Sequence, residues 1–248
     1  MSGSGTQGRP PDERVPEADG GSEVFARVAH ELMTPLSAAM GFAVVVRDNL
    51  DAMDAEAVKR SCNTIVRALK AAENLVQTLA EMRSVDEGDV VLELVEVPVG
   101  EFVTEVVHDL EPLTGPHHIS VSVLHDGVAR IDRMKVRQIL TNLLSNAAKF
   151  SPPDSPITVD VSGDDRWLEI AVVDACPGID HEAIERVFDK YERLGAQQKG
   201  TGLGLYISRG LARAHGGELS ASSDGRNGCR FVLKLPLDPS TAPEPTTG

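Results

Sequence analysis

Two neighbouring stretches of this 248-residue chain repeat their apolar residues at alternating steps of three and four, which constrains the fold more than any other feature. An average period of 3.5 residues is typical of helices that pack side by side. The first seam comprises Phe25, Val28, Leu32, Pro35, Ala39, Phe42 and Val46, and the second comprises Val58, Cys62, Ile65, Leu69, Ala72, Val76 and Leu79. We expect an antiparallel helical hairpin and, because a lone hairpin buries little, a homodimer in which two hairpins form a four-helix bundle.

Beyond Gly88 the pattern mixes strands with helices. Strands are expected at 90–97, 119–124, 157–161, 167–173, 219–221 and 229–235. Helices are expected at 99–113, 132–149 and 203–215, the last ended by Gly216 and Gly217. The predicted fold class is therefore α+β, with a helical hairpin followed by an α/β sandwich in which helices cover one face of a sheet.

Composition marks the domain boundaries. Residues 1–21 are rich in Gly, Pro and charges and lack apolar periodicity, which predicts a flexible leader, and residues 237–248 predict a flexible tail. We expect the hairpin over 22–86 and the sheet domain over 87–236, with the boundary near Val85 to Asp89.

Charge and apolar content exclude several classes of protein. The 24 Lys and Arg stand against 38 Asp and Glu, a net charge of −14, which argues against nucleic acid or anionic lipid as partners. No uninterrupted apolar run approaches the ~18 residues of a membrane span, and no signal segment begins the chain. Cys62, Cys176 and Cys229 are too far apart for a metal knuckle or a disulfide framework. These features favour a cytoplasmic protein without a membrane span.

His30 lies on the outward face of the first expected helix, at the position farthest from the seam. Thr34 shares that face, Glu31 lies beside it, and Pro35 should bend the helix. A lone surface histidine is most often simply solvated. However, the string from His30 to Leu36, His-Glu-Leu-Met-Thr-Pro-Leu, resembles the phospho-acceptor box of sensor histidine kinases.

Four later segments resemble the ATP-binding boxes of the same family, in the same order. They are the asparagine box at 142–150, the first glycine box at 174–179, the phenylalanine box at 187–193 and the second glycine box at 200–205, with residues 194–199 as a short lid. Amide oxygens suit Mg²⁺, and a Lys ammonium suits phosphate oxygens. A glycine-rich turn that opens a helix presents free N–H groups to phosphate.

The resemblance covers about residues 22–236 and implies the transmitter core of a histidine kinase with a Bergerat-type ATP-binding domain. It implies that ATP and Mg²⁺ bind, that His30 is phosphorylated, and that the phosphoryl group passes to an aspartate of a response regulator receiver domain. Glu31 would orient the imidazole, and Thr34 would support dephosphorylation of the regulator. Asn146, and secondarily Asn142, are the implied Mg²⁺ ligands. The implied nucleotide-binding residues are Asn142, Asn146, Lys149, Phe150, Asp174, Gly178, Ile179, Tyr191, Arg193, Gly200, Thr201, Gly202, Leu203, Gly204 and Leu205.

The first glycine box departs from the family's usual Asp-Asn-Gly-x-Gly, because Ala175 replaces Asn and Cys176 replaces Gly. A small buried thiol is the commoner role for such a cysteine than a redox role. The departure favours one alternative, an ATP-impaired phosphotransfer protein or pseudokinase that relays phosphoryl groups from another kinase. A second alternative, an ATPase of the gyrase and chaperone superfamily, leaves the His30 box unexplained. No recognisable sensor sequence precedes Ser22 in this chain, so we expect the input from a separate sensory partner or a missing sensor region.

Overall fold

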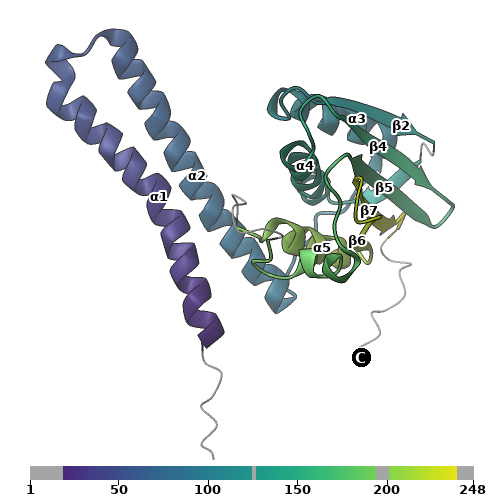
Figure 1. Cartoon of the computed structure of the whole chain (residues 1–248). Coiled ribbons are helices and arrows are strands. Elements are labelled where there is room, and N and C mark those ends of the chain that lie inside the picture. The colour runs from purple at the N-terminus through teal and green to yellow at the C-terminus, as the bar shows by residue number, and fades with distance from the viewer. Residues whose placement is uncertain (1–18, 125–126, 194–200, 239–248) are drawn as a thin grey trace, which may run out of the picture. The chain divides into compact units, whose positions relative to one another are not determined.

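The computed structural model describes residues 19–124, 127–193 and 201–238. The chain divides into two compact units, one ending at Ala72 and the other beginning at Glu73 (Figure 1). The expected end of the hairpin, residue 86, lies next to the end of the second helix at Glu87. The division falls earlier because the C-terminal turns of that helix contact the sheet domain.

The first unit is a pair of long helices. Helix α1 spans Asp19–Asn49 and α2 spans Ala55–Glu87, and a short 3₁₀ helix at Leu50–Ala52 lies between them. Asp54 accepts a hydrogen bond from the backbone N–H of Ala57 (2.6 Å), which caps the start of α2. Helix α1 continues through Pro35, whose ring nitrogen cannot donate to the carbonyl of Glu31.

Within one chain the two seams are only partly covered. Ala39 and Ala72 are buried, as is Ser61, whereas Phe42 and Leu69 remain 41% and 49% exposed. By length and composition alone, the segment Val28–Ala52 is also apolar enough to cross a membrane, with a mean hydropathy of 1.3. The sequence predicted no such segment because no apolar run is long enough without interruption. The hydropathy averaged over the helix is nevertheless high, since its scattered Gly, Ser and Thr lower the average only slightly.

The second unit contains a mixed five-stranded sheet in the order β2-β4-β5-β7-β6. The strands are β2 (His118–Val123), β4 (Pro156–Gly163), β5 (Trp167–Asp174), β6 (Glu218–Ser223) and β7 (Cys229–Pro236). Strands β2 and β4 are parallel, and the other neighbours are antiparallel. A separate antiparallel pair joins β1 (Val95–Pro98) to β3 (Val128–Ile131).

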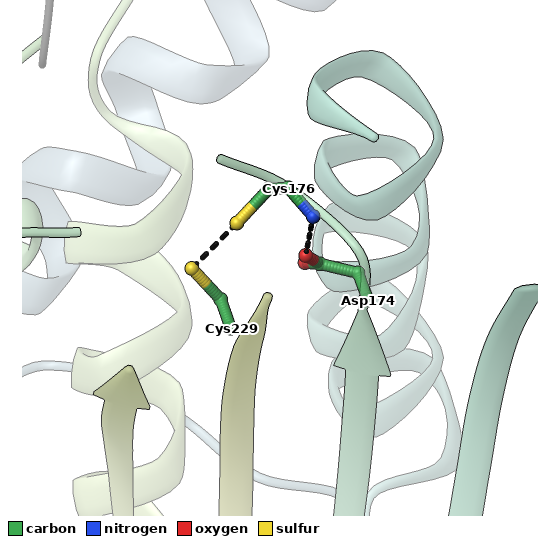
Figure 2. A group of neighbouring side chains, drawn as sticks. All are labelled: Asp174, Cys176 and Cys229. Carbon is green, nitrogen blue, oxygen red and sulfur yellow. Dashed lines mark hydrogen bonds between the residues drawn. The ribbon is translucent and has the colours of Figure 1, made fainter. Parts of the chain in front are cut away.

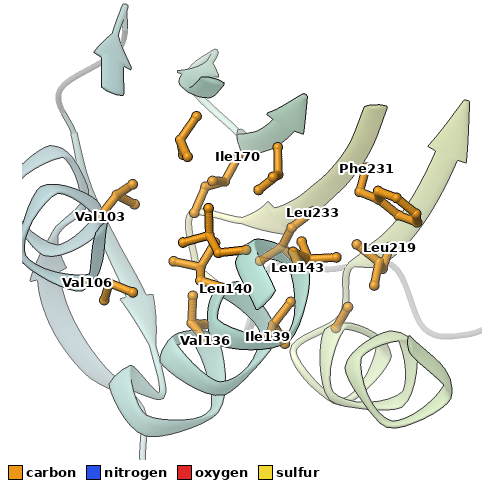
Figure 3. Packing of buried hydrophobic residues seen from close by; sticks show 14 of the residues in the cluster. Val103, Val106, Val136, Ile139, Leu140, Leu143, Ile170, Leu219, Phe231 and Leu233 are labelled. Atoms are coloured by element: carbon orange, nitrogen blue, oxygen red, sulfur yellow. The ribbon is translucent and has the colours of Figure 1, made fainter. Parts of the chain in front are cut away.

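Three helices cover one face of this sheet: α3 (Val99–Leu110), α4 (Arg133–Phe150) and α5 (Gly204–Ala214) (Figure 1). Figure 3 shows that Val103 and Val106 of α3 and Leu140 and Leu143 of α4 face the sheet residue Ile170 in one apolar core. Helix α4 begins where the Asp132 carboxylate accepts from the N–H groups of Met134 and Lys135, both at 3.0 Å. Helix α5 ends at His215 and is followed by Gly216 with φ +74°.

The predicted α+β class is confirmed, with differences in detail. Only Val95–Pro98 of the expected strand 90–97 pairs with a partner, and the expected helix 99–113 ends as α3 at Leu110, followed by a 3₁₀ turn. Strand β3 was not expected, because its four residues are too short for an alternating pattern to stand out. Short 3₁₀ helices occupy His181–Ala183 and Arg186–Phe188.

Candidate functional site

A cavity of about 620 Å³ lies in the second unit. Its lining comes from the C-terminal half of α4, the turn after β5 and the segment 187–193. The start of α5 and the start of β7 complete it. Thr78 of α2 also lines it. The cavity therefore gathers side chains that are more than a hundred residues apart in the sequence.

The asparagine residues of α4 form one wall. Asn142 and Asn146 both line the cavity, one helical turn apart. The amide nitrogen of Asn142 donates to Ser208 Oγ (3.0 Å), and that of Asn146 lies 3.5 Å from Asn142 Oδ1. These contacts turn the Asn146 nitrogen toward its neighbour, so the amide oxygen is the group that Asn146 can offer to a hard cation such as Mg²⁺. Asn142 is held more firmly, by Ser208 of α5.

Two cationic side chains reach the same cavity. Lys149 lies near the end of α4, with its ammonium 4.6 Å from the centre of the Phe150 ring, and Arg193 is the last residue of the segment 187–193. Burial and, to a lesser extent, the positive charge of Arg193 lower the pKa of Lys149. An anion bound between the two cations would relieve this repulsion, so this part of the cavity suits phosphate oxygens.

A buried carboxylate also lines the cavity. Asp174, the last residue of β5, is 8% exposed, and its Oδ1 accepts from the backbone N–H of Cys176 (2.8 Å). Gly178 has φ +89°, and a Cβ atom there would lie 2.6 Å from the backbone nitrogen of Arg226. Only glycine fits that position, so this turn holds Asp174 at the cavity with little freedom.

The glycine-rich turn before α5 completes the lining. Gly202 has φ +68°, and a Cβ atom there would lie 2.7 Å from the backbone carbon of Tyr191. The backbone N–H of Leu203 donates to Thr201 Oγ1 (3.2 Å), and α5 begins one residue later. The start of a helix therefore lies at the cavity, where its unpaired N–H groups favour an anion.

The predicted nucleotide residues are distributed as follows. Those that line the cavity are Asn142, Asn146, Lys149, Phe150, Asp174, Gly178, Ile179, Arg193, Thr201, Gly202, Gly204 and Leu205. Leu203 instead lies fully buried in the core, and the hydroxyl of Tyr191 contacts Met82 Sδ (3.3 Å) rather than the cavity. Gly200 and the expected lid at 194–199 lie outside the described residues.

Several lining residues were not expected from the sequence. Thr78, Pro177, Val187, Glu192, Cys229 and Phe231 all line the cavity, and Cys176 lines it beside Asp174. Cys229 and Phe231 come from β7, which lies next to β5 in the sheet. No local motif marks Cys229 and Phe231, because their place follows from strand pairing, whereas Pro177, Val187 and Glu192 lie inside the predicted boxes.

The predicted phospho-acceptor residues lie in the first unit. His30 is exposed on α1, Glu31 is half-buried, and Thr34 is exposed. The Thr34 hydroxyl donates to the backbone carbonyl of His30 (2.9 Å). The imidazole therefore points into solvent from a helix, as the sequence predicts.

Comparisons with known proteins agree with this geometry. Residues 131–239 match the family model described as histidine kinase-, DNA gyrase B- and HSP90-like ATPase. The chain is 30% identical to the signal transduction histidine-protein kinase AfsQ2 of Streptomyces coelicolor over 92% of its own length and 45% of that protein. The chain spans less than half the length of the first curated relatives it matches.

Two solved structures share the fold. The Acinetobacter baumannii histidine kinase AdeS matches 84% of this chain and 98% of its own, with a TM-score of 0.65 and 20% identity. Histidine kinase ThkA, solved in complex with the response regulator protein TrrA, matches 88% of this chain and 62% of its own, with a TM-score of 0.63 and 25% identity. The sheet domain is thus an ATPase domain of the histidine kinase, gyrase and chaperone type.

The similarity extends beyond this domain, because AfsQ2 aligns over 92% of the chain. Together these similarities support a transmitter core of the sensor histidine kinase type.

Proposed function

We propose that this protein transfers the γ-phosphoryl group of ATP to His30 and then to an aspartate of a response regulator receiver domain. The observation that carries the proposal is the cavity in which Asn146, Lys149, Asp174, Arg193 and the turn at Gly202 converge. The carboxylate suits a nucleotide base, and the cations together with the helix start suit a triphosphate. ThkA, whose structure includes a response regulator, supports the choice of partner.

The acceptor chemistry follows from the placement of His30. A neutral imidazole has one nitrogen that can attack a phosphorus atom, and a carboxylate that accepts from the other nitrogen favours the reactive tautomer. Glu31, the next residue on α1, is the group we assign to this role. Because His30 and the cavity belong to separate compact units, the transfer requires the His30 imidazole to reach the cavity of the other unit.

Thr34 is assigned to the opposing activity, the hydrolytic dephosphorylation of the regulator. Its hydroxyl donates to the carbonyl of His30, and its oxygen can still accept from a water molecule placed against a phosphoaspartate. A Thr34→Val variant should therefore keep autophosphorylation and lose phosphatase activity toward the regulator.

Mg²⁺ fits the amide groups of α4, and we assign Asn146 as its principal protein ligand and Asn142 as a second candidate. When bound, the ion supplies positive charge that offsets the charge of the transferred phosphoryl group. Lys149 and Arg193 act on the same phosphate oxygens and orient the triphosphate.

The remaining parts of the proposal concern assembly and input. The exposed apolar residues of α1 and α2 suit a second copy of the hairpin, so we propose a homodimer. A separate sensory partner or a sensor region outside this chain would supply the stimulus. Because ATP and receiver domains are found in the cytoplasm, we propose that the reaction takes place there.

Incubation of the purified protein with γ-labelled ATP and Mg²⁺ tests the central step. We expect acid-labile, base-stable label on the protein, and none in His30→Gln or Asn146→Asp. His108→Gln, which removes another exposed histidine, is the matched control and should label normally. Label that persists in His30→Gln would exclude His30 as the acceptor.

The alternative, a pseudokinase that relays phosphoryl groups from another kinase, is favoured by one observation. The Cys176 residue, which replaces the family's glycine, lines the cavity itself. If calorimetry detects no ATP or ADP binding while His30 accepts phosphoryl groups from a phosphorylated receiver domain, the alternative holds.

A further inference from the structure

Two buried thiols meet in the wall of the cavity. Cys176, in the turn after β5, and Cys229, the first residue of β7, are 7% and 3% exposed, and both line the cavity. Figure 2 shows that their sulfur atoms point toward each other. The sulfur–sulfur distance is 2.6 Å. Asp174 lies beside them, and its carboxylate accepts from the N–H of Cys176.

The backbone holds the two cysteines together independently of their side-chain rotamers. Asp174 of β5 and Cys229 of β7 are direct partners in the antiparallel pairing. The N–H of Gly228 donates to the carbonyl of Cys176 (2.7 Å), which ties the turn after β5 to the start of β7. The two cysteines therefore lie on adjoining backbone segments, which is what a cross-link between them requires.

The ligand set favours a disulfide over a structural metal site. The sulfurs and an oxygen of Asp174 lie within 4.8 Å of one another, so a thiophilic ion is the obvious competing occupant. A structural zinc is held by four protein ligands, whereas three gather here among the described residues. The Asp174 carboxylate also already accepts from the Cys176 N–H.

We propose that Cys176 and Cys229 are a redox site, forming a reversible disulfide that stiffens the cavity wall and strengthens nucleotide binding. The effect on the nucleotide rests on the proposed function. With hydrogen peroxide as oxidant, one thiolate attacks an oxygen and forms a sulfenic acid, and the other sulfur displaces hydroxide from it. Overall, two thiols and one peroxide give one disulfide and two water molecules, and a dithiol reductant reverses the change by exchange.

The disulfide should strengthen nucleotide binding because of the segments that it would connect. The 53-residue separation between the cysteines contains the segment with Arg193, the turn at Gly202 and helix α5, all of which contribute to the cavity. Because the turn and β7 already adjoin, the bond would hold the wall in the arrangement described rather than distort it. A preorganised site binds its ligand more tightly, and a cross-link removes conformations from the unfolded chain.

The reaction should be slow at neutral pH. Burial raises the pKa of Cys176 and of Cys229, so each thiol is largely protonated near pH 7. The thiolate is the nucleophile, and long exposure to oxidant at mildly alkaline pH is therefore the appropriate condition.

The test uses the full chain with Cys62→Ser, which removes the exposed third thiol and prevents cross-links between copies. The protein is treated with a chelator, exposed to hydrogen peroxide at about pH 8.5, and divided into samples with and without dithiothreitol. We expect a mass loss equal to two hydrogen atoms and a non-reduced peptide that joins Cys176 to Cys229. We also expect a melting temperature higher by several degrees and ADP affinity at least about threefold tighter than after reduction.

The matched control is Cys62→Ser with Cys229→Ser, which should show none of these redox-dependent differences. Alkylation of both thiols in the denatured, peroxide-treated protein would overturn the proposal. A disulfide that leaves ADP affinity unchanged would overturn the coupling to the nucleotide. If ADP binds neither form although the disulfide is present, the nucleotide assignment of the cavity fails and the disulfide itself stands.

Discussion

At the residue scale, Asp132 and His215 join the start of α4 to the end of α5. The backbone N–H of Asp132 donates to His215 Nε2 (3.1 Å), while Nδ1 of the same ring lies 2.7 Å from the carbonyl oxygen of Leu211. Since Nε2 accepts, the proton of the neutral ring must lie on Nδ1. The fully buried His215 is therefore a fixed structural connection that requires the neutral imidazole.

This arrangement predicts a dependence of stability on pH. Burial lowers the pKa of His215 below its ordinary value near 6.5. The unfolded state then binds more protons than the folded state, so stability is full above the unfolded pKa and decreases as pH falls through about 6.5 toward the lower folded pKa.

Urea denaturation between pH 5 and 8 measures that dependence. In the unmodified protein, we expect the urea concentration at the unfolding midpoint to decrease as the pH is lowered below about 6.5. In His215→Gln, part of this decrease with pH should disappear. The exposed His108→Gln variant should keep the slope. An unchanged slope in His215→Gln would assign the effect to other groups.

A second prediction at this scale concerns the glycine turn before α5. In Gly202→Ala the new Cβ would collide with the backbone of Tyr191, whereas Gly225→Ala has a similar positive φ (+76°) and only one atom near it, at 3.8 Å. Both variants carry the same type of backbone strain, of order 1 kcal/mol. We expect ADP affinity to fall at least tenfold in Gly202→Ala and to stay within about twofold in Gly225→Ala, as calorimetry would show. Equal losses in both would mean that the strain, and not the collision, matters.

At the scale of elements, the C-terminal turns of α2 are anchored to the domain that contains the cavity. The Asp86 carboxylate accepts from Lys190 Nζ (2.7 Å) and from the hydroxyl of Tyr206 in α5 (2.6 Å). These two bonds lower the pKa of Asp86. Gln138 of α4 also donates to Glu81 of α2. The end of α2 thus contacts both helices that line the cavity.

Removal of the Asp86 charge should loosen this anchor. Because the pair with Lys190 is partly exposed, we expect Asp86→Asn to cost less than about 1 kcal/mol of global stability. Amide exchange over 80–87 should nevertheless become faster, while exchange in β5 and β7 stays the same. Glu87→Gln, whose partner Arg83 lies on the same helix, is the control and should leave exchange at 190 and 206 unchanged. Unaltered exchange over 80–87 in Asp86→Asn would show that apolar contacts alone hold the helix.

At the scale of the whole molecule, the proposed bundle predicts what a charge on its apolar face would do. Leu69 of α2 is 49% exposed in the single chain, and a homodimer would bury it against the second hairpin. Leu69→Glu should therefore weaken dimerisation by at least tenfold, because an unpaired carboxylate would have to be buried. Arg67→Glu, two residues away on the other side of the helix, should leave the dimer intact. Sedimentation at several concentrations distinguishes the two, and an intact Leu69→Glu dimer would place the interface elsewhere.

Most of the elements and most of the candidate cavity residues could be predicted from the sequence. Heptad spacing predicted α1 and α2, and alternating residues predicted β4 and β5 within a few positions. Asn146, Asp174 and Gly202 stand in short local motifs, and the structure brings all three to one cavity. These predictions succeed because periodicity, turn residues and motif spacing depend on neighbours along the chain.

The tertiary structure alone decided which distant residues meet. Leu203 lies in the core although it stands in the glycine motif, and Phe231 reaches the cavity although no motif contains it. The anchoring of Asp86 by Lys190 joins residues 104 positions apart, and the contact of Cys176 with Cys229 depends on the pairing of β5 with β7. Strand order and helix packing arise from burial of apolar surface shared by the whole domain, and no local spacing encodes them.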